Sequence, residues 1–161
     1  FFVPASTEKF FMKLFKDNNN IKVVGFGNYN IDMVWSKLKY KLFNKNLAMP
    51  RVRTVLNAAI FLSVEMGYKE VCVLGLNNDW FKNIFVDKDN VVRIFDTHFY
   101  ESAENDKMPV IEGTVHEELI SSAIALESHH RINEYAENKG VAIYNASSSS
   151  MVDAYKRKYD I

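Results

Sequence analysis

Cysteine is almost absent from this chain of 161 residues, which contains only Cys72. A disulfide needs two thiols, and a zinc site built on cysteine pairs needs more, so neither can form within the chain. Cys72 lies in the apolar run VCVLGL (71–76), where we expect it to be a small, buried strand residue.

Net charge and long apolar runs are also lacking. Lys plus Arg and Asp plus Glu both total 20, so the chain as a whole predicts no long-range attraction for nucleic acid or an anionic membrane. No apolar run reaches the roughly 20 residues of a membrane-spanning helix, and the first residues do not form a secretion signal. We therefore expect a protein of the cytoplasm or of the inner face of the membrane.

Common nucleotide and zinc motifs are missing as well. No GxxxxGK[ST] loop occurs, and the sequence GFG at 25–27 has no third glycine to complete a dinucleotide fingerprint. His116, His129 and His130 give no pair at the i, i+4 spacing of a zinc-binding helix. The sequence motifs alone therefore do not identify a cofactor.

Apolar residues make up 48% of the chain, and their spacing predicts alternating helices and strands. Short apolar runs at 21–26, 71–76 and 141–146 are typical of strands in a covered parallel sheet. Helical spacing or capping residues occur at 7–18, 31–43, 52–66, 114–139 and 150–158, and a hairpin is indicated at 83–96. This order predicts a Rossmann-like, doubly wound, mainly parallel α/β sheet with a small β-hairpin insertion, in one domain spanning 1–161.

Polar loops follow the three predicted strands. If the strands are parallel, the loops meet at one edge of the sheet, where open α/β sheets bind ligands. The candidate substrate-binding residues at this edge are Asn28, Asn77, Asn78, Asp79, Trp80, Asn145, Ser147 and Ser148, together with Thr54 at the start of the stretch 54–80. They suit the hydroxyls of a sugar or the polar groups of a nucleotide, and ordinary Asn and Ser turn chemistry is the alternative.

His98 lies just after the predicted hairpin, between Asp96 and Tyr100. Because the pKa of a histidine is near neutrality, His98 in this place could take a proton from an acceptor hydroxyl. A structural histidine that bonds to the loop backbone is the alternative.

Three segments of the chain resemble a known family: MPRVRTVLNAAIFLSVEMGYKEVCVLGLNNDW, DTHFYES and YAENKGVAIYNASSSSMVDAY. In this order they resemble bacterial surface-polysaccharide glycosyltransferases of the sialyltransferase-like class. That class is related to flagellin-glycosylation accessory and pterin-diphosphokinase-like proteins. The resemblance covers about residues 46–158.

The resemblance implies transfer of a sugar from a nucleotide donor, CMP-linked in this class, onto a surface glycan. It implies that His98 is the general base, that Tyr100 neutralises the leaving phosphate, and that no metal or other cofactor is required. Residues after Gly75 would lie near the donor sugar, and residues 145–148 near the nucleotide.

Two further expectations concern the start of the chain. The family's upstream GxGxS-type loop has no counterpart, and the chain begins FFVP, so we expect the C-terminal part of a longer glycosyltransferase. The apolar start also makes a homo-oligomer plausible. The rival functions are a non-catalytic sugar-binding or assembly domain and an ATP-dependent diphosphokinase, which would need Mg²⁺ and acidic ligands.

Overall fold

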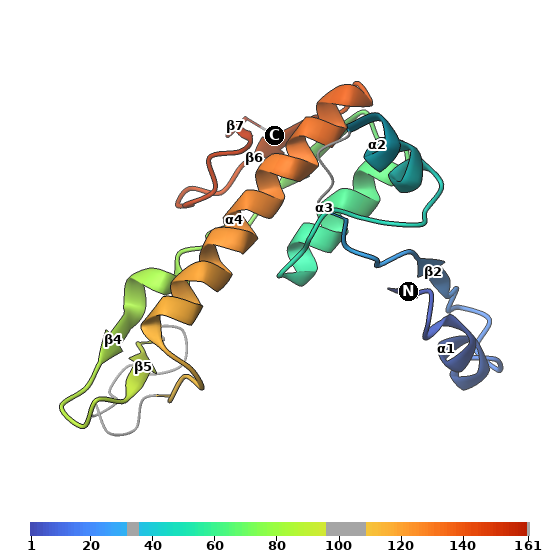
Figure 1. Ribbon diagram of the computed structural model, residues 1–161. Coiled ribbons are helices and arrows are strands. Elements are labelled where there is room, and N and C mark those ends of the chain that lie inside the picture. Colours follow the sequence, from blue (N-terminus) through green and yellow to red (C-terminus); the bar gives the residue numbers. More distant parts are fainter. Residues whose placement is uncertain (32–35, 96–108, 161) are drawn as a thin grey trace. The chain divides into compact units, whose positions relative to one another are not determined.

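The structure is a computed structural model that describes residues 1–31, 36–95 and 109–160. The chain divides into two compact units, Phe1–Val52 (the N-terminal unit) and Arg53–Ile161 (the C-terminal unit). The described residues have mixed α/β structure with parallel strand pairs in both units (Figure 1). The expected α/β class is therefore confirmed.

The N-terminal unit begins with a small β-α-β arrangement. Strand β1 (Phe2–Pro4) pairs in parallel with β2 (Val24–Phe26), and helix α1 (Glu8–Leu14) connects them. Helix α2 (Ser36–Asn44) follows. The apolar run at 21–26 thus gives a strand only in its second half, and β1 was not predicted because three residues ending in proline carry little strand signal.

A close backbone approach ties the end of α2 to β2. Asn46, in the left-handed conformation at φ 54°, donates from Nδ2 to the Gly25 carbonyl (3.3 Å) and accepts from the Gly27 amide (3.1 Å). A Cβ at Gly27 would lie 2.2 Å from the Asn46 carbonyl oxygen, so only glycine fits there.

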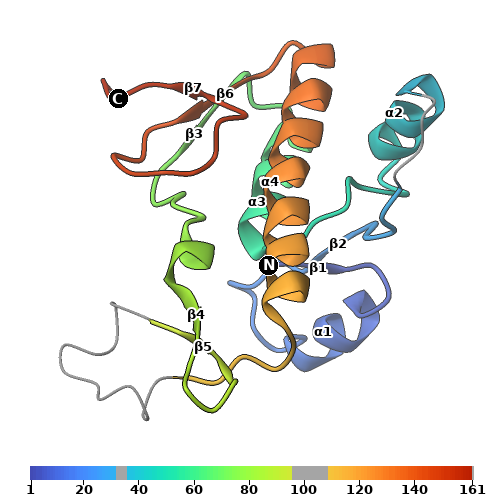
Figure 2. The same ribbon diagram turned by 60° about the vertical axis from the view of Figure 1, so that its left-hand side comes forward.

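The C-terminal unit is built on a three-stranded parallel sheet in the order β3-β6-β7. Its strands are β3 (Glu70–Val73), β6 (Ala142–Asn145) and β7 (Lys156–Arg157). Helices α3 (Val55–Glu65) and α4 (Val115–Asn138) pack against each other and contact β3 and β6, respectively (Figure 2). Buried apolar residues of this unit are Ile60, Phe61, Val64, Val73, Leu76, Ala125, Ile132, Tyr135, Ala136, Val141, Ile143, Val152 and Tyr155.

The position of β3 corrects the expectation for Cys72, which is exposed rather than buried. Neighbouring residues of a strand point to opposite faces, and Val73 takes the buried face. In the described sheet β3 is an edge strand and β6 is the central one. The apolar run at 71–76 predicted the strand correctly, but not which of its residues are covered.

The long helix and the hairpin agree with the sequence prediction. Thr114 caps α4 through its hydroxyl, which accepts from the Glu117 amide (3.2 Å), and the Glu117 carboxylate accepts from the Thr114 amide (2.8 Å). The hairpin comprises β4 (Ile84–Val86) and β5 (Val92–Ile94), and a 3-10 turn, η1 (Trp80–Asn83), precedes it. No described helix, in 1–31, 36–95 or 109–160, combines the length and apolarity needed to cross a bilayer.

The helix expected at 150–158 does not form, and that prediction is wrong. The described chain there runs through bends into β7. Val152 and Tyr155 are three residues apart, as on one face of a helix, and both are buried. Their side chains reach the core, however, from a chain that is not helical. Arg157 donates to the carbonyls of Ser147, Ser150 and Val152, so this guanidinium replaces helical bonds.

The capping box of α4 gives a first test of the fold. Replacing Thr114 with alanine removes the acceptor for the Glu117 amide, and we expect a loss of about 1 kcal/mol in the free energy of unfolding. Urea denaturation measures it. Thr114→Ser keeps the hydroxyl and should retain most of the stability; equal losses in both variants would contradict the capping role.

Candidate functional site

The loops that follow β3 and β6 meet at the carboxyl edge of the sheet. Val73 and Asn145 are register partners at the strand ends. Beyond them, the Leu76 amide donates to the Ser147 hydroxyl (2.8 Å), and the Met151 amide donates to the Asn77 carbonyl (2.8 Å). The expectation that these two loops share one edge is therefore confirmed. Asn28, from the third predicted loop, is exposed in the N-terminal unit.

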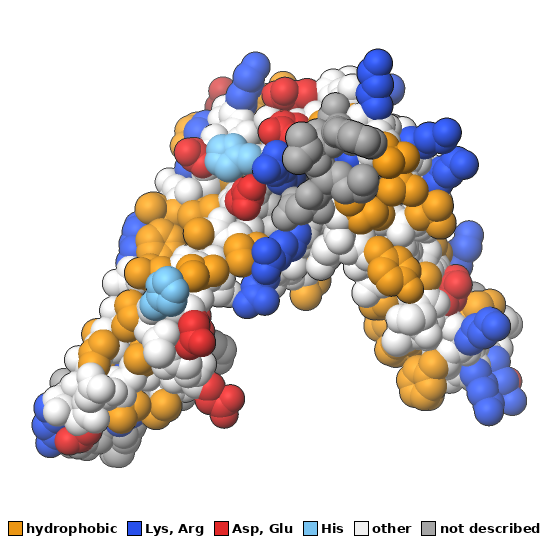
Figure 3. Space-filling model, viewed as in Figure 1, with side chains coloured by type: hydrophobic (Ala, Val, Ile, Leu, Met, Phe, Trp, Pro, Cys, Tyr) orange, Lys and Arg blue, Asp and Glu red, His pale blue; other side chains and the backbone are white. Residues whose placement is uncertain are grey.

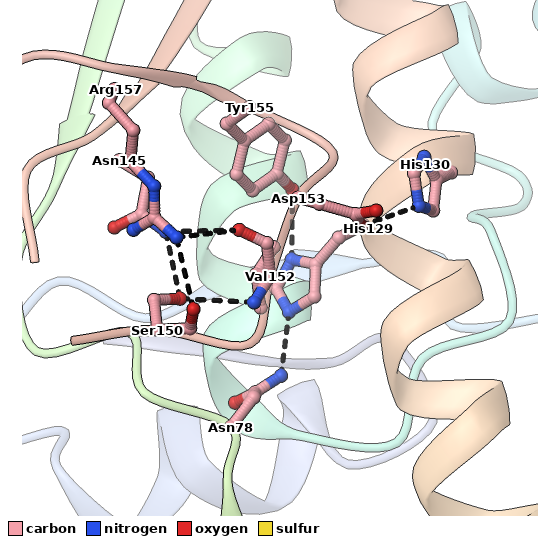
Figure 4. A network of polar contacts seen from close by, with 9 residues as sticks. All are labelled: Asn78, His129, His130, Asn145, Ser150, Val152, Asp153, Tyr155 and Arg157. Carbon is pink, nitrogen blue, oxygen red and sulfur yellow. Dashed lines mark hydrogen bonds and ion pairs between the residues drawn. The ribbon is translucent and has the colours of Figure 1, made fainter.

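Asn145 and Ser147 hold the second loop together. The Asn145 side chain is fully buried; its Oδ1 accepts from the Ser147 amide (3.0 Å), and its Nδ2 donates to the Ser150 hydroxyl (2.9 Å) (Figure 4). Ser147 is buried too, and its hydroxyl accepts from the first loop. Both residues are buried and stabilise the loops at this edge through hydrogen bonds, whereas Ser148 is exposed.

Arg157 brings a positive charge to this loop. Its guanidinium donates to the Ser150 carbonyl at 3.0 Å and to the Ser147 and Val152 carbonyls at 3.4 Å (Figure 4). A carbonyl that accepts from a guanidinium is held in one orientation. Arg157 therefore stabilises one conformation of the loop. The sequence pattern did not single out this residue.

His129 lies at the centre of the C-terminal unit and joins three other segments. Its Nε2 is 3.0 Å from the Asn57 Nδ2 of α3 and 3.0 Å from the Asn78 Nδ2 of the loop after β3. Its Nδ1 is 2.9 Å from the Tyr155 hydroxyl just before β7 (Figure 4). Side-chain contacts of α4 thus reach α3 and both polar loop regions through one buried imidazole.

The hydrogen bonds determine which ring nitrogen carries the proton. Asn57 Oδ1 accepts from the Arg53 and Thr54 amides, so its Nδ2 is the atom that faces His129. An amide nitrogen only donates, so His129 Nε2 must be the unprotonated acceptor. The neutral imidazole therefore carries its proton on Nδ1 and donates it to the Tyr155 oxygen.

This environment keeps His129 uncharged. Burial, and to a smaller extent the neighbouring His130, lower its pKa from 6.5 to about 4. Burial also raises the pKa of Tyr155. His130 itself is exposed and lies 3.0 Å from Asp153. His129 is therefore a neutral hydrogen-bonding hub rather than a charged group at neutral pH.

The hub includes one further candidate residue, Thr54. Thr54 caps α3, and its hydroxyl accepts from the Asn57 amide (3.1 Å) and donates to Asn57 Oδ1 (2.9 Å). The contacts Thr54–Asn57–His129–Asn78 connect the start of α3 to the loop after β3. Thr54 and Asn78 are thus brought into one network whose visible role is to position the loop.

The remaining candidates of the first loop keep part of their surface accessible. Asn77, Asp79 and Trp80 are partly exposed, and Asp79 and Trp80 begin the η1 turn. Together with Ser148, they are the candidates on these two loops that keep accessible surface. His98 and Tyr100 lie outside the described residues, so their predicted roles stay predictions.

Sequence reasoning missed the hub, although one signal for His129 was present. His129, Ile132 and Ala136 share one helical face, the buried one, so a histidine on this stripe is buried and needs partners. Nothing in the sequence marks Tyr155 or Asn57 as those partners, because all three segments are far apart along the chain.

A metal site and a pocket are two other kinds of site that the described part of the chain could form. Within 1–31, 36–95 and 109–160, no three His, Cys, Asp or Glu side chains gather as they would to hold a metal ion. A pocket of about 530 Å³ opens near the start of β6, lined by Asn133, Glu137, 140–144 and 153–156. Its lining includes the end of the segment that links β6 to β7 but none of residues 74–80 and 146–151, so it is distinct from the two loops at the carboxyl edge.

Comparison of the chain with protein-family models, curated proteins and solved structures finds no match.

Proposed function

We propose that this chain is part of a bacterial glycosyltransferase of the sialyltransferase-like class, with a Rossmann-like, doubly wound fold. It would transfer a sugar from a CMP-linked donor to a surface glycan, without a metal, in the cytoplasm at the inner face of the membrane. One observation carries the proposal. Two polar loops meet at the carboxyl edge of a parallel sheet, which is where open α/β sheets bind their ligands.

The accessible groups at this edge suit a nucleotide better than a bare phosphate. Trp80 offers a ring on which a base can stack, and Asn77, Asp79 and Ser148 offer amide, carboxylate and hydroxyl groups for ribose and sugar. The buried residues Asn78, Asn145 and Ser147 then act by positioning the loops rather than by touching the ligand. Arg157 stabilises the same loop by donating hydrogen bonds to its carbonyl oxygens.

In the proposed reaction, His98 takes the proton of the acceptor hydroxyl as the acceptor oxygen attacks the anomeric carbon. The bond from that carbon to the phosphate oxygen breaks, and the leaving CMP is stabilised by Tyr100 and by loop amides. Direct displacement of this kind needs the donor phosphate and the acceptor on opposite sides of the sugar.

One observation favours a second candidate function, a non-catalytic sugar-binding or assembly domain. Four of the candidate side chains, Thr54, Asn78, Asn145 and Ser147, already bond within the protein. A domain that only binds a sugar would need fewer side chains available for ligand contacts than an enzyme, which must also position two substrates. In that case, nucleotides would not bind, whereas free sugars would.

Replacing His98 with alanine in the full-length enzyme tests the proposal. We expect transfer from the CMP-sugar to fall by at least about 100-fold, because a general base typically contributes this much. The rise in melting temperature caused by CMP should remain, since His98 is assigned to the acceptor. His116→Ala, at an exposed histidine in the first turn of α4, is the matched control and should leave transfer unchanged.

The same assay separates the rival functions. A melting-temperature rise with ATP that requires Mg²⁺, and no rise with CMP, would indicate a diphosphokinase instead. No rise with any nucleotide would favour the non-catalytic domain. Full transfer by the His98→Ala enzyme would refute the assigned base.

A further inference from the structure

Helix α1 has an unusual surface for a helix of a globular protein, because none of its residues is buried. Phe10 is 65% exposed and Leu14 is 59% exposed, on adjacent turns of one helix face. Phe1 is 62% exposed and packs its ring against Phe11 and Phe15, with ring centroids 5.9 and 5.5 Å apart. We call these five side chains the aromatic patch.

The neutral total charge of the chain hides a strong asymmetry between the two units. Residues 1–52 carry nine Lys or Arg and three Asp or Glu, whereas residues 53–161 carry 11 and 17. The N-terminal unit is therefore basic and the C-terminal unit acidic. The expectation that no anionic surface attracts the protein was based on the sum of charges, which does not describe the N-terminal unit.

Lysines flank the aromatic patch on α1. Lys9 and Lys13 are exposed, lie one turn apart, and each precedes a residue of the patch, Phe10 or Leu14, so the two stripes run side by side. Glu8 contributes one negative charge to this helix, and its carboxylate accepts from the Gly25 amide (2.8 Å), so Lys9 and Lys13 leave α1 with a net positive charge. Figure 3 shows Lys and hydrophobic side chains together over α1.

We propose that the N-terminal unit docks on an anionic lipid surface through the aromatic patch and its flanking lysines. Phe10 and Leu14 would enter the boundary between headgroups and acyl chains, while Lys9 and Lys13 contact lipid phosphates. A second copy is a poorer partner, because a symmetric contact through this face would place the same lysines against each other. This proposal is independent of the catalytic one.

Vesicle sedimentation of the full chain tests the docking surface. We expect binding to phosphatidylcholine vesicles that contain about 30% phosphatidylglycerol, and binding about tenfold weaker to phosphatidylcholine alone. Raising NaCl from about 0.05 to about 0.5 M should weaken binding to the anionic vesicles, since exposed charges are then screened. The double variant Phe10→Ser/Leu14→Ser and the double variant Lys9→Glu/Lys13→Glu should each lose at least about tenfold in affinity.

Matched controls come from the C-terminal unit. Leu74→Ser replaces a leucine that is 71% exposed, and Lys88→Glu reverses an exposed lysine in the hairpin turn; neither should change binding. Circular dichroism shows whether each variant keeps its fold. Equal binding to neutral and anionic vesicles, or no binding to either, would overturn the proposal. So would a concentration-dependent rise in mass without lipid that Phe10→Ser/Leu14→Ser abolishes, because the patch would then bind a second copy.

Discussion

Replacing His129 with alanine is expected to lower the free energy of unfolding by about 3–5 kcal/mol. The substitution removes a fully buried ring and leaves a cavity. It also removes the acceptor for the Asn57 and Asn78 amides and the partner of the Tyr155 hydroxyl. Buried polar groups that lose their partners add a cost to that of the lost packing, so we expect an effect in the upper part of the range for core substitutions. Urea denaturation at neutral pH measures it.

The adjacent residue supplies the control. His130 follows His129 in the same helix, but it is exposed and its partner, Asp153, is exposed too. His130→Ala should therefore change the free energy of unfolding by no more than about 0.5 kcal/mol. If the two alanine variants were equally stable, His129 would not be the hub of the C-terminal unit.

Acid should destabilise the protein through the same residue. The pKa of His129 is about 4 in the folded chain, because of burial, and 6.5 without that environment. The folded state therefore favours the neutral ring, and the stability this gives is complete above pH 6.5. It is lost as the pH falls from 6.5 towards 4, and the difference in pKa corresponds to about 3 kcal/mol.

Two measurements isolate this contribution. In a series of urea denaturations, the wild type should lose stability between pH 6.5 and pH 4 more steeply than His129→Leu, which cannot be protonated. Histidine NMR of the wild type should show a His129 ring that stays neutral above pH 5. Parallel pH profiles for the two proteins, or a His129 ring that titrates near 6.5, would contradict the buried neutral hub. The carboxyl groups of Asp87 and Glu117, whose pKa values hydrogen bonds lower, lose their own contribution in more acidic solution.

Those parts of the fold that depend on local signals could be predicted from the sequence. The capping pair Thr114 and Glu117 located the start of α4, and the residues DKDN located the hairpin turn. The parallel direction of β3 and β6 agrees with the predicted mainly parallel sheet, although the prediction did not name them as neighbours. These features are encoded within a few residues of where they occur, or by the general rule for a crossover connection.

The parts that failed depend on contacts between distant segments. Val152 and Tyr155 have helical spacing, yet Arg157 binds the carbonyls that a helix would use, and β6 offers a strand partner instead. Cys72 looked buried because its neighbours are apolar, but the face of β3 it occupies is set by the register with β6. Neither outcome can be calculated from local propensity.

The candidate site divides in the same way. The positions of Asn77 and Ser147 at one edge followed from parallel strands, so their meeting could be predicted. That Asn78 and Asn145 are buried and bonded within the protein could not be predicted. His129, the partner of Asn78, comes from a distant segment, and Asn145 reaches Ser150 and Val152 only because of the path that the loop after β6 takes. In the two polar loops, the buried candidate residues therefore hold the backbone in place, and only the remaining candidates are accessible to a ligand.

Titration of the ¹⁵N-labelled chain with CMP tests the central claim most directly, because it locates the ligand as well as detecting it. The proposed function predicts amide shift changes concentrated in the two loops at 74–80 and 146–151, at the carboxyl edge of β3 and β6. Changes confined to the pocket at 140–144 and 153–156, or no changes at CMP concentrations up to several millimolar, would contradict a nucleotide site at that edge.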